Sequence, residues 1–590
     1  MNQELRRCQN CKVQFVIEPD DFSFYEHIKV PAPTWCPECR FKRRLIFWNE
    51  HNLYRKKDAK TGKEIFSMFP EESHVKIYDH DYWWSDAFDG REYARDYDFK
   101  KPFFVQFKEL LDEVPWYARS IQKMVESDYS NNATGLKNCY LCFNGNTSED
   151  CMYGIAFDGM KSSLDFYQCM AGELCYEIFS VGPGYKNFFC MECGGCRDSW
   201  FLLNCQDCSN CFGCVNLRHQ QYHIFNVPYS KEEYFKKLAE FNLGSYAALT
   251  EIRKKVYELW LRYPRKYMHG VHNSNASGDY VYASKDAEWC YQVVSVEHGK
   301  WVQNVANVVK DSYDYTNWGM NSELIYDSIT CGQDLQRLKF CVECWPGCQD
   351  LEYCVSCHSS MNLFGCVGLK KGEYCILNKQ YSRDEYFALR EKIMKHMDEM
   401  PYIRQSADGK SQIVYRYGEF FPIEFSPFAY TEAAIHDYYP LKKEEAVAQG
   451  FIWRDPQPRE FEVTMQAKDL PDHIKEVSHA VAKEIIACGL CKRAYRILTQ
   501  ELEFLKRFSI PLPRLCHKCR YLERRKFRNP YKFWHRRCNC AGIKSENDIY
   551  TNLSGHLHGN GHCQNEFETS YAPDRPETVY CEQCYQAEVA

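Results

Sequence analysis

The chain has 590 residues, a formal net charge of −6, 34 cysteines and 16% aromatic residues. This length predicts several domains, and the aromatic content argues against a disordered chain. The negative net charge excludes a protein that is basic over its whole surface, so contact with nucleic acid needs local basic patches. Because the chain begins without an apolar leader and has no run of about eighteen apolar residues, we expect a soluble, cytoplasmic protein with no membrane partner.

A pair of Cys-x-x-Cys motifs opens the chain, and the same pair returns near the other end, shifted by 480 residues. Two such motifs place four thiolates around one Zn²⁺ ion, whereas the alternative, a pair of disulfides, is typical of secreted proteins. The sequence therefore predicts a zinc ribbon at each end. The predicted ligands are Cys8, Cys11, Cys36 and Cys39 in the first ribbon and Cys488, Cys491, Cys516 and Cys519 in the second.

Basic residues follow the last cysteine of each ribbon, with aromatic residues such as Trp48 and Trp534 among them. Cations that neutralise phosphates, next to aromatic rings that stack on bases, are typical of RNA-binding surfaces. The alternative is that these cations pair with acidic side chains of the same chain. The candidate nucleic-acid-binding residues are Arg40, Arg43, Arg44, Arg520, Arg524, Arg525, Arg536 and Arg537.

A second cysteine motif follows in the C-terminal copy. Its five cysteines predict a third zinc site with one surplus ligand, which gives about three zinc ions per chain. At the matching N-terminal positions the chain has Asp58, Thr61, Asp79 and Tyr82, so we expect a degenerate site held by packing. An insertion of about 22 residues divides the C-terminal motif and carries three histidines that we expect at the surface. The five cysteines are Cys538, Cys540, Cys563, Cys581 and Cys584, and the histidines are His556, His558 and His562.

Short aromatic and cysteine runs recur about every twelve residues from 135 to 228 and again from 273 to 380. This recurrence predicts a duplicated parallel β-solenoid with two strands per rung of about 24 residues. The two blocks match at a shift of 152 residues, and each precedes a Ser-x-x-Glu helix signal, at Ser230 and Ser382. We expect the interior cysteines to be buried core residues. Metal binding by some of them is the alternative, although residues three apart along a strand would face opposite sides.

The predicted fold class is therefore mostly β with helices, with zinc-ribbon modules at both ends flanking a duplicated parallel β-solenoid. We divide the chain into seven segments. They are an N-terminal zinc module with a degenerate second site (1–100), a helical connector (101–134), the first solenoid (135–228), a helical segment (229–272), the second solenoid (273–380), a helix with a mixed α/β linker domain (381–475), and a C-terminal zinc module with two zinc sites (476–590) that begins with a predicted helix at 476–487.

Several motifs together resemble an uncharacterised cysteine-rich zinc-ribbon family of candidate-phyla (Patescibacteria-type) bacteria. They include CQNC at 8–11, TWCPECR at 34–40, WWSD at 83–86, KNCYL at 137–141 and TSYAPDRPETVYCEQCYQ at 569–586. The family pattern has cysteines at positions 58, 61, 79 and 82, which agrees with a lost second site here. The resemblance implies zinc ribbons but no established activity. Some relatives carry a CaiB/BaiF-type CoA-transferase label, which no open α/β pattern or acidic nucleophile supports in this chain.

Three functions remain open on the sequence alone. We favour a non-enzymatic protein whose ribbons bind RNA, a ribonucleoprotein or a protein partner. In this hypothesis the solenoids act as a rigid spacer between the ribbons. The second is a solenoid enzyme, such as a carbohydrate-active one, with an acidic cleft, and the third is redox or metal storage by the interior thiols. No nucleotide-binding Gly-rich loop, HExxH or GxSxG occurs in a supporting context, so no small-molecule substrate is indicated. The acidic candidates are Asp150, Asp165, Glu173, Asp314, Glu323 and Asp327.

Overall fold

The computed structural model describes residues 2–406, 409, 411–455 and 461–589, and the chain forms two compact units. Unit 1 consists of Met1–Ser120 and Met268–Pro456, and unit 2 of Ile121–Tyr267 and Gln457–Ala590. Each unit contains one solenoid and one terminal cysteine module. The N-terminal module belongs with the second solenoid and the C-terminal module with the first. Each module therefore joins the solenoid that lies farther from it along the sequence.

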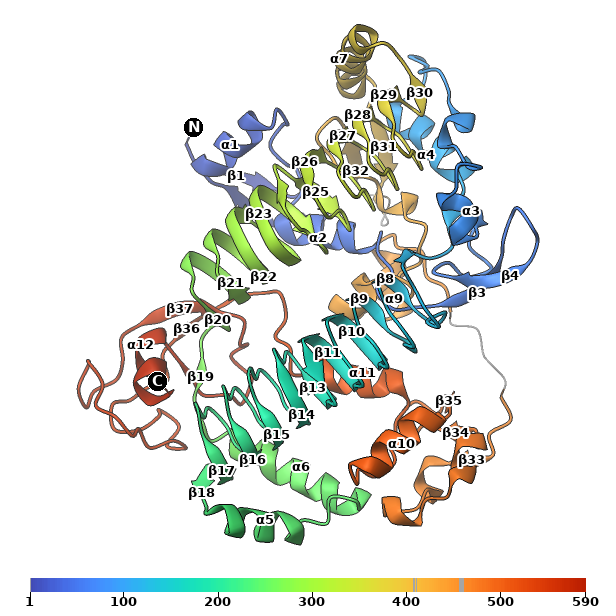
Figure 1. The fold of residues 1–590 in the computed structure, drawn as a ribbon. Helices are drawn as coiled ribbons and strands as arrows, with labels where there is room; N and C mark the ends of the chain where they lie inside the picture. Colours follow the sequence, from blue (N-terminus) through green and yellow to red (C-terminus); the bar gives the residue numbers. More distant parts are fainter. Residues whose placement is uncertain (1, 407–408, 410, 456–460, 590) are drawn as a thin grey trace. The chain divides into compact units, whose positions relative to one another are not determined.

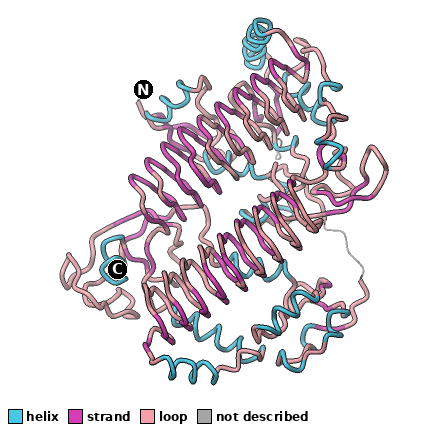
Figure 2. The backbone as a smooth tube through the Cα atoms, in the orientation of Figure 1, coloured by secondary structure: helices cyan, strands magenta, loops and turns pink. Residues whose placement is uncertain are grey.

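The first solenoid, in unit 2, is a stack of short parallel strands (Figures 1 and 2). Met152 pairs with Leu164, and Leu164 pairs with Tyr176, so each coil advances the chain by 12 residues. This corrects the predicted rung of about 24 residues. The strands are β7 (Ile121–Gln122), β8 (Asn131–Thr134), β9 (Phe143–Asn146), β10 (Met152–Asp158), β11 (Leu164–Met170), β12 (Gly172–Glu173), β13 (Tyr176–Phe179), β14 (Gly184–Phe188), β15 (Arg197–Trp200), β16 (Ser209–Phe212) and β17 (Gln221–Ile224), with β18 (Val227–Pro228) antiparallel at the end.

A left-handed backbone conformation at every third residue shapes these coils. Asn138, Leu141 and Asn144 have φ angles of 51°, 51° and 53°. In an ordinary strand the side chains alternate between two faces. Here each left-handed residue turns the chain, and the next residue, such as Cys139 or Cys142, is buried in the core. Residues three apart therefore face inward together, which corrects the expectation that they would lie on opposite sides.

The cysteines from Cys139 to Cys375 are all buried, as expected for core residues. With three residues per side, a coil of 12 residues encloses a narrow interior that suits small side chains. Cysteine is small and behaves as a hydrophobic residue when its thiol is protonated. The thiols also act as weak donors: Cys205 Sγ lies 3.5 Å from the carbonyl oxygen of Leu203. The Cys-x-x-Cys spacing inside the solenoids is thus a packing pattern.

The second solenoid, in unit 1, follows the same plan with less regular coils. Partners are 11 residues apart at Ser274 and Lys285 and 13 apart at Tyr313 and Tyr326. Both solenoids begin before the predicted boundaries. The strands are β20 (Gly270–Val271), β21 (Ser274–Tyr282), β22 (Lys285–Lys300), β23 (Gln303–Thr316), β24 (Ser322–Glu323), β25 (Tyr326–Ile329), β26 (Leu335–Lys339), β27 (Gln349–Glu352), β28 (Met361–Phe364), β29 (Glu373–Ile376) and the antiparallel β30 (Lys379–Gln380).

A helix follows each solenoid, as the Ser-x-x-Glu signals predict. Ser230 caps α5 (Lys231–Glu240) and Ser382 caps α7 (Arg383–Glu399), each through reciprocal hydrogen bonds with the glutamate three residues later. After a break at Gly244, α6 (Tyr246–Trp260) continues the first helical segment. The prediction of a helix after each solenoid is therefore confirmed.

The two cysteine modules repeat one order of elements, which confirms the internal duplication. In unit 1 it runs β1 (Glu4–Arg7), β2 (Gln14–Ile17), α1 (Pro19–His27), α2 (Pro37–Leu45), β3 (Tyr54–Lys57), β4 (Glu64–Ser67), β5 (Ile77–Tyr78) and α3 (His80–Trp84). In unit 2 it runs β34 (Ile486–Ala487), β35 (Ala494–Tyr495), α10 (Thr499–Arg507), α11 (His517–Arg525), β36 (Trp534–Arg537), β37 (Glu566–Thr569), β38 (Val579–Tyr580) and α12 (Glu582–Val589). We call residues 4–45 the N-terminal ribbon and 486–525 the C-terminal ribbon.

Two predicted helical stretches differ in the structure. The helix α4 (Phe103–Glu113) ends before Pro115, and β6 (Trp116–Tyr117) pairs with β5 where a continued helix was expected. Residues 476–487 form short 3₁₀ turns and a strand in place of the predicted helix. The remaining elements are β19 (Arg265–Lys266), β31 (Tyr402–Gln405), β32 (Gln412–Tyr415), α8 (Ile435–Tyr438), α9 (Lys443–Ala448) and β33 (Met465–Gln466), with 3₁₀ turns at Gly90–Tyr93, Ile423–Phe425, Ala467–Asp469, Ile474–Glu476 and His479–Lys483.

Candidate metal centres

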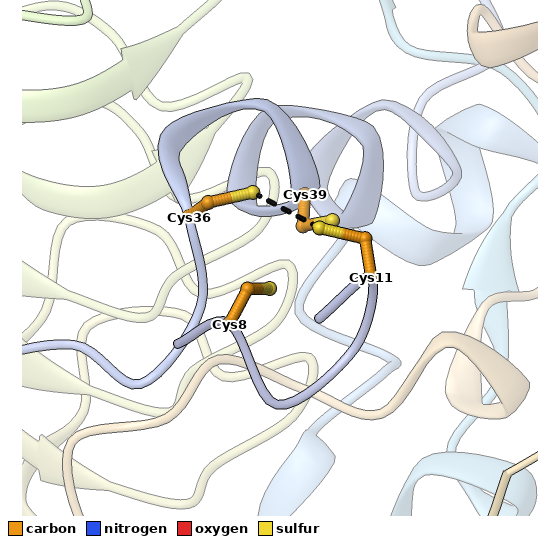
Figure 3. A group of neighbouring side chains, drawn as sticks. All are labelled: Cys8, Cys11, Cys36 and Cys39. Atoms are coloured by element: carbon orange, nitrogen blue, oxygen red, sulfur yellow. Dashed lines mark hydrogen bonds between the residues drawn. The ribbon is translucent and has the colours of Figure 1, made fainter. Parts of the chain in front are cut away.

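The cysteines of the N-terminal ribbon meet where the β1–β2 hairpin approaches the start of α2 (Figure 3). Cys8 and Cys11 come from the hairpin, and Cys36 and Cys39 from the first turn of α2. The four sulfurs lie within 4.8 Å of one another, with Cys11 Sγ 3.6 Å from Cys36 Sγ. Zn–S bonds of about 2.3 Å place the corners of a tetrahedron about 3.8 Å apart. The group therefore fits a tetrahedral ion such as Zn²⁺ with four protein ligands.

The C-terminal ribbon repeats this geometry. Cys491 Sγ lies 3.7 Å from Cys516 Sγ. The two hairpin turns also share a left-handed residue, Lys12 with φ of 64° and Lys492 with φ of 63°. The structure thus brings together both predicted ligand sets, the second being Cys488, Cys491, Cys516 and Cys519.

Backbone hydrogen bonds favour the thiolate form of one cysteine of the C-terminal ribbon, Cys488. Burial opposes ionisation of Cys488, but backbone N–H groups, first that of Cys516, lower its pKa to about 6. The Cys516 N–H group donates to Cys488 Sγ at 3.2 Å. In the solenoids, burial raises the pKa of Cys169 and Cys290 to about 12. Because the thiolate is the form that binds metal, Cys488 suits a metal ion, whereas burial favours the protonated thiol at Cys169 and Cys290.

A third group lies between the β36–β37 hairpin and α12. It consists of four of the five predicted cysteines, Cys538, Cys563, Cys581 and Cys584. Cys563 Sγ lies 3.9 Å from Cys581 Sγ, and the N–H group of Cys581 donates to Cys538 Sγ at 3.2 Å. A backbone donor aimed at sulfur stabilises the thiolate, as in the ribbons. The structure therefore identifies Cys540 as the surplus cysteine of this Cys₄ set.

Cys540 belongs to another group of potential ligands, with His556, His558 and Cys584. The His556 side chain is 1% exposed and His558 is half-buried, which corrects the surface position expected for these two histidines. His562 is exposed, as expected. The sequence does carry a signal for this group. His556 and His558 form a His-x-His pair within the insertion that divides the cysteine motif.

A hydrogen bond replaces the cysteines at the matching N-terminal hairpin. Asp58 is 2% exposed and accepts from the hydroxyl group of Thr61 at 2.5 Å and from its N–H group at 3.0 Å. The two hairpins share a backbone hydrogen bond at this position. The Asp58 N–H group donates to the Lys63 carbonyl oxygen at 2.9 Å, and the Cys538 N–H group of the other copy donates to the Asn565 carbonyl oxygen at 2.9 Å. The side-chain and backbone bonds of Asp58 hold this turn where the other copy has thiolates.

The arginines that follow the last cysteine of the N-terminal ribbon are buried on α2. Arg40, Arg43 and Arg44 are each at most 1% exposed. Arg40 and Arg44 lie 2.8 and 3.0 Å from Asp314, while Arg43 and Arg44 lie 3.0 and 2.7 Å from Asp327. Asp314 belongs to β23 and Asp327 to β25 of the second solenoid. This corrects the exposed position assumed for the three arginines, which join the ribbon helix to the solenoid.

Unit 2 has the equivalent interface between α11 and β11. Arg520 and Arg524 lie 2.9 and 3.0 Å from Asp165, and Arg520 lies 3.1 Å from Glu501. The two arginine side chains are 3% exposed, which again corrects the exposed position assumed from the sequence. Both ribbons therefore dock through arginines four residues apart that meet one buried aspartate.

The other three basic candidates also have internal contacts. The guanidinium of Arg525 lies 5.8 Å from the ring centre of Tyr521, and Arg537 lies 3.4 Å from Glu546. Arg536 donates to the carbonyl oxygens of Tyr571 and Ala572. These contacts match the alternative in which the cations pair within the chain.

Three of the acidic residues considered for a solenoid enzyme are used in the same interfaces. Asp165, Asp314 and Asp327 have 0% exposure and contact arginines. They do not line an open cleft. Sequence reasoning missed one further group of potential ligands, Glu50, His51 and Asp437, because no motif links residues so far apart along the chain.

Comparisons with known proteins add no family. No family model matches the chain, and no curated protein matches it. Among solved structures, a proposed acetyltransferase from Desulfovibrio desulfuricans G20 is similar at 7% identity over 52% of this chain and 85% of that chain, with a TM-score of 0.10. The UDP-N-acetylglucosamine acyltransferase from Campylobacter jejuni is similar at 8% identity over 48% and 88%, with a TM-score of 0.09. At such TM-scores neither similarity carries an argument about function.

Within the part of the chain that the structure describes, no helix has both the length and the apolar character needed to cross a bilayer.

Proposed function

We propose that this chain is a non-enzymatic, zinc-dependent structural and interaction protein. The observation that carries the proposal is the position of the ribbon cysteines on the docking helices. Cys36 is the N-cap of α2 and Cys516 is the N-cap of α11, and Cys39 and Cys519 lie in the first turn of each helix. An ion bound to these thiolates fixes the start of the helix that carries the buried arginines.

Zinc in such a site stabilises the fold. Four protein thiolates leave no coordination position for water or substrate, so the sites are closed to metal catalysis. The ribbons contain strands of only two to four residues, and zinc binding contributes about 10–16 kcal/mol to modules of this kind. Without the ion, the arginines would lose the helix that holds them against their carboxylates, and burying an unpaired charge is costly.

The solenoids supply a surface for a partner. Stacked coils form a long, rigid face, and repeat architectures commonly bind partners on such faces. We propose a protein partner in a reducing compartment, because the arginines predicted to contact RNA are engaged within the chain. RNA retained on the purified protein at low salt, and lost as salt rises, would instead favour the nucleic-acid interpretation.

Metal analysis and limited proteolysis of the full chain test this proposal. We expect at least three zinc ions per chain, one for each Cys₄ group. Chelation should make residues 4–45 and 486–525 susceptible to cleavage before the solenoids. As a matched pair, Cys39→Ser should lose one ion and Cys205→Ser, inside the first solenoid, should lose none. Fewer than about two ions per chain, or chelation without new cleavage in the ribbons, would overturn the proposal.

A further inference from the structure

We propose that the C-terminal module holds two metal ions that share the sulfur of Cys584, so that the chain binds four zinc ions. This inference rests on the zinc-dependent function proposed above. One ion would occupy the Cys₄ set, and the other would occupy the mixed cysteine and histidine set. The ligands of the first ion are Cys538, Cys563, Cys581 and Cys584, and those of the second are Cys540, His556, His558 and Cys584.

The second set has the spacing of a tetrahedral site. Cys540 Sγ lies 3.6 Å from His556 Nδ1, and His558 Nε2 lies 3.3 Å from Cys584 Sγ. Zn–S bonds of about 2.3 Å and Zn–N bonds of about 2.0 Å place a sulfur and a nitrogen about 3.5 Å apart at tetrahedral angles. All four ligand atoms lie within 4.8 Å of one another. The four atoms can therefore surround a single ion.

Hydrogen bonds outside the set orient both imidazole rings. His556 Nε2 lies 3.0 Å from a Glu588 carboxylate oxygen, and that carboxylate side chain has 0% exposure. His558 Nδ1 lies 2.8 Å from the carbonyl oxygen of Gly561. With these nitrogens donating outward, the other nitrogen of each ring faces a cysteine sulfur with its lone pair. Carboxylate and carbonyl acceptors behind the ring are typical of metal-binding histidines.

The charge of the cluster also favours a second ion. Each cysteine loses its proton on binding metal, so the five buried thiolates carry five negative charges. Counting the five thiolates alone, one Zn²⁺ ion leaves a net charge of −3 and two leave −1, because neutral histidines add none. An excess of buried negative charge is unfavourable, so the second ion stabilises the thiolate form of all five cysteines.

The insertion that carries the histidines has little apolar core of its own. Ile543, Ile549, Leu553 and Leu557 are 61%, 50%, 80% and 92% exposed. Tyr550 is the one buried hydrophobic residue among positions 541–562 of the described chain. Ordering a loop of this length costs conformational entropy that such small burial does not offset. An ion that ties two of its histidines to Cys540 and α12 supplies the missing stabilisation.

Zinc content of the full chain and of two variants tests the inference. We expect four ions in the wild type and three in the double variant H556A/H558A. The matched control H562A removes an exposed histidine of the same insertion and should keep four. Three ions in the wild type, or equal zinc in the wild type and H556A/H558A, would overturn the shared site while leaving the ribbons intact. A wild-type content below about two ions would overturn the proposed function as well.

Cadmium-113 NMR of the cadmium-loaded wild type provides a readout that needs no variant. A shared thiolate should couple two of the four cadmium resonances to each other through Cys584 Sγ. The two remaining resonances, from the ribbons, should show no such coupling. Uncoupled resonances throughout would overturn the shared site even if H556A/H558A failed to fold.

Discussion

The two ribbon–solenoid interfaces are alike, whereas the hairpins beside them differ. In each unit, two arginines four residues apart on the ribbon helix meet one buried aspartate, Asp314 in unit 1 and Asp165 in unit 2. The following hairpin has cysteines that could hold a metal ion in unit 2 and the Asp58–Thr61 hydrogen bond in unit 1. Under the proposed function, the ribbon Cys₄ set is present in both units because a bound ion would position the docking helix. In the hairpin turn of unit 1, a hydrogen bond takes the place of the ligands.

A second difference lies on the docking helices themselves. Arg43 in unit 1 contacts both Asp327 and Glu419, at 3.0 and 2.9 Å. The matching residue in unit 2 is Glu523, which pairs with Lys526 at the surface at 2.7 Å. Unit 1 therefore has additional buried ion pairs, and unit 2 has additional cysteine and histidine groups that could hold metal. The two copies thus share the ribbon–solenoid interface but differ in the contacts next to it.

The largest expected effect separates the two ribbons. Cys519→Ser should remove the ion of the C-terminal ribbon and about 10 kcal/mol of stabilisation from that module. Hydrogen exchange should then speed up in α11 and stay unchanged in α2, which belongs to the other unit. The variant Cys39→Ser should give the reverse pattern. Equal protection of α11 with and without its ion would contradict the role given to the metal.

Removing the shared aspartate should have the next largest effect. Asp165→Asn leaves Arg524 without its carboxylate, and breaking a buried ion pair costs about 3–5 kcal/mol. Asp314→Asn should cost about as much, because it leaves Arg40 without its carboxylate while Arg44 retains Asp327, just as Arg520 retains Glu501 in unit 2. Denaturant unfolding of the two variants measures both losses. A loss well below about 3 kcal/mol for either variant would contradict the role given to the shared aspartate.

Replacing the hairpin hydrogen bond should have a smaller effect. Asp58→Ala removes the acceptor of the Thr61 hydroxyl and N–H groups, and a loss of about 1–3 kcal/mol is expected. The variant D58C/T61C/D79C/Y82C restores the cysteines of the other copy and should bind one more zinc ion than the wild type. Unchanged zinc content in that variant would mean that the two hairpins differ in more than their ligands.

The smallest effect concerns the coils of the solenoid. Ala171 is exposed and left-handed, with φ of 51°. A left-handed conformation costs a residue with a Cβ about 1–2 kcal/mol, so Ala171→Gly should stabilise unit 2 by up to about 1 kcal/mol. In an ordinary strand, the same change would destabilise by a similar amount. A lower melting temperature for Ala171→Gly would contradict the three-residue geometry.

The sequence predicted the architecture but not the three-residue repeat within each solenoid coil. Spacing alone predicted both ribbons, the duplication and the helix caps at Ser230 and Ser382. The recurrence of twelve residues was visible, yet it was interpreted as half a rung because strands normally alternate with a period of two. The three-residue repeat requires a left-handed backbone conformation at residues such as Leu141 and Tyr153. Leucine and tyrosine rarely adopt this conformation, so it could not be predicted from the sequence.

The role of the arginines could not be read from local sequence. Arg520 to Arg537 contains one acid, so the stretch appeared unbalanced and exposed. The carboxylate that neutralises Arg524 is Asp165, 359 residues earlier in the chain. Pairing over such a separation is set by the docking of the ribbon on the solenoid. In the same way, His556 and His558 join Cys584 only after the insertion folds back onto α12.

The central claim is that metal in each ribbon holds the arginine helix on its solenoid. Hydrogen exchange measured by mass spectrometry before and after complete removal of zinc from the full chain tests it most directly. We predict that α2 and α11 lose protection together with their ribbons, while the buried strands of both solenoids keep theirs. Full protection of α2 and α11 in metal-free protein would contradict the claim.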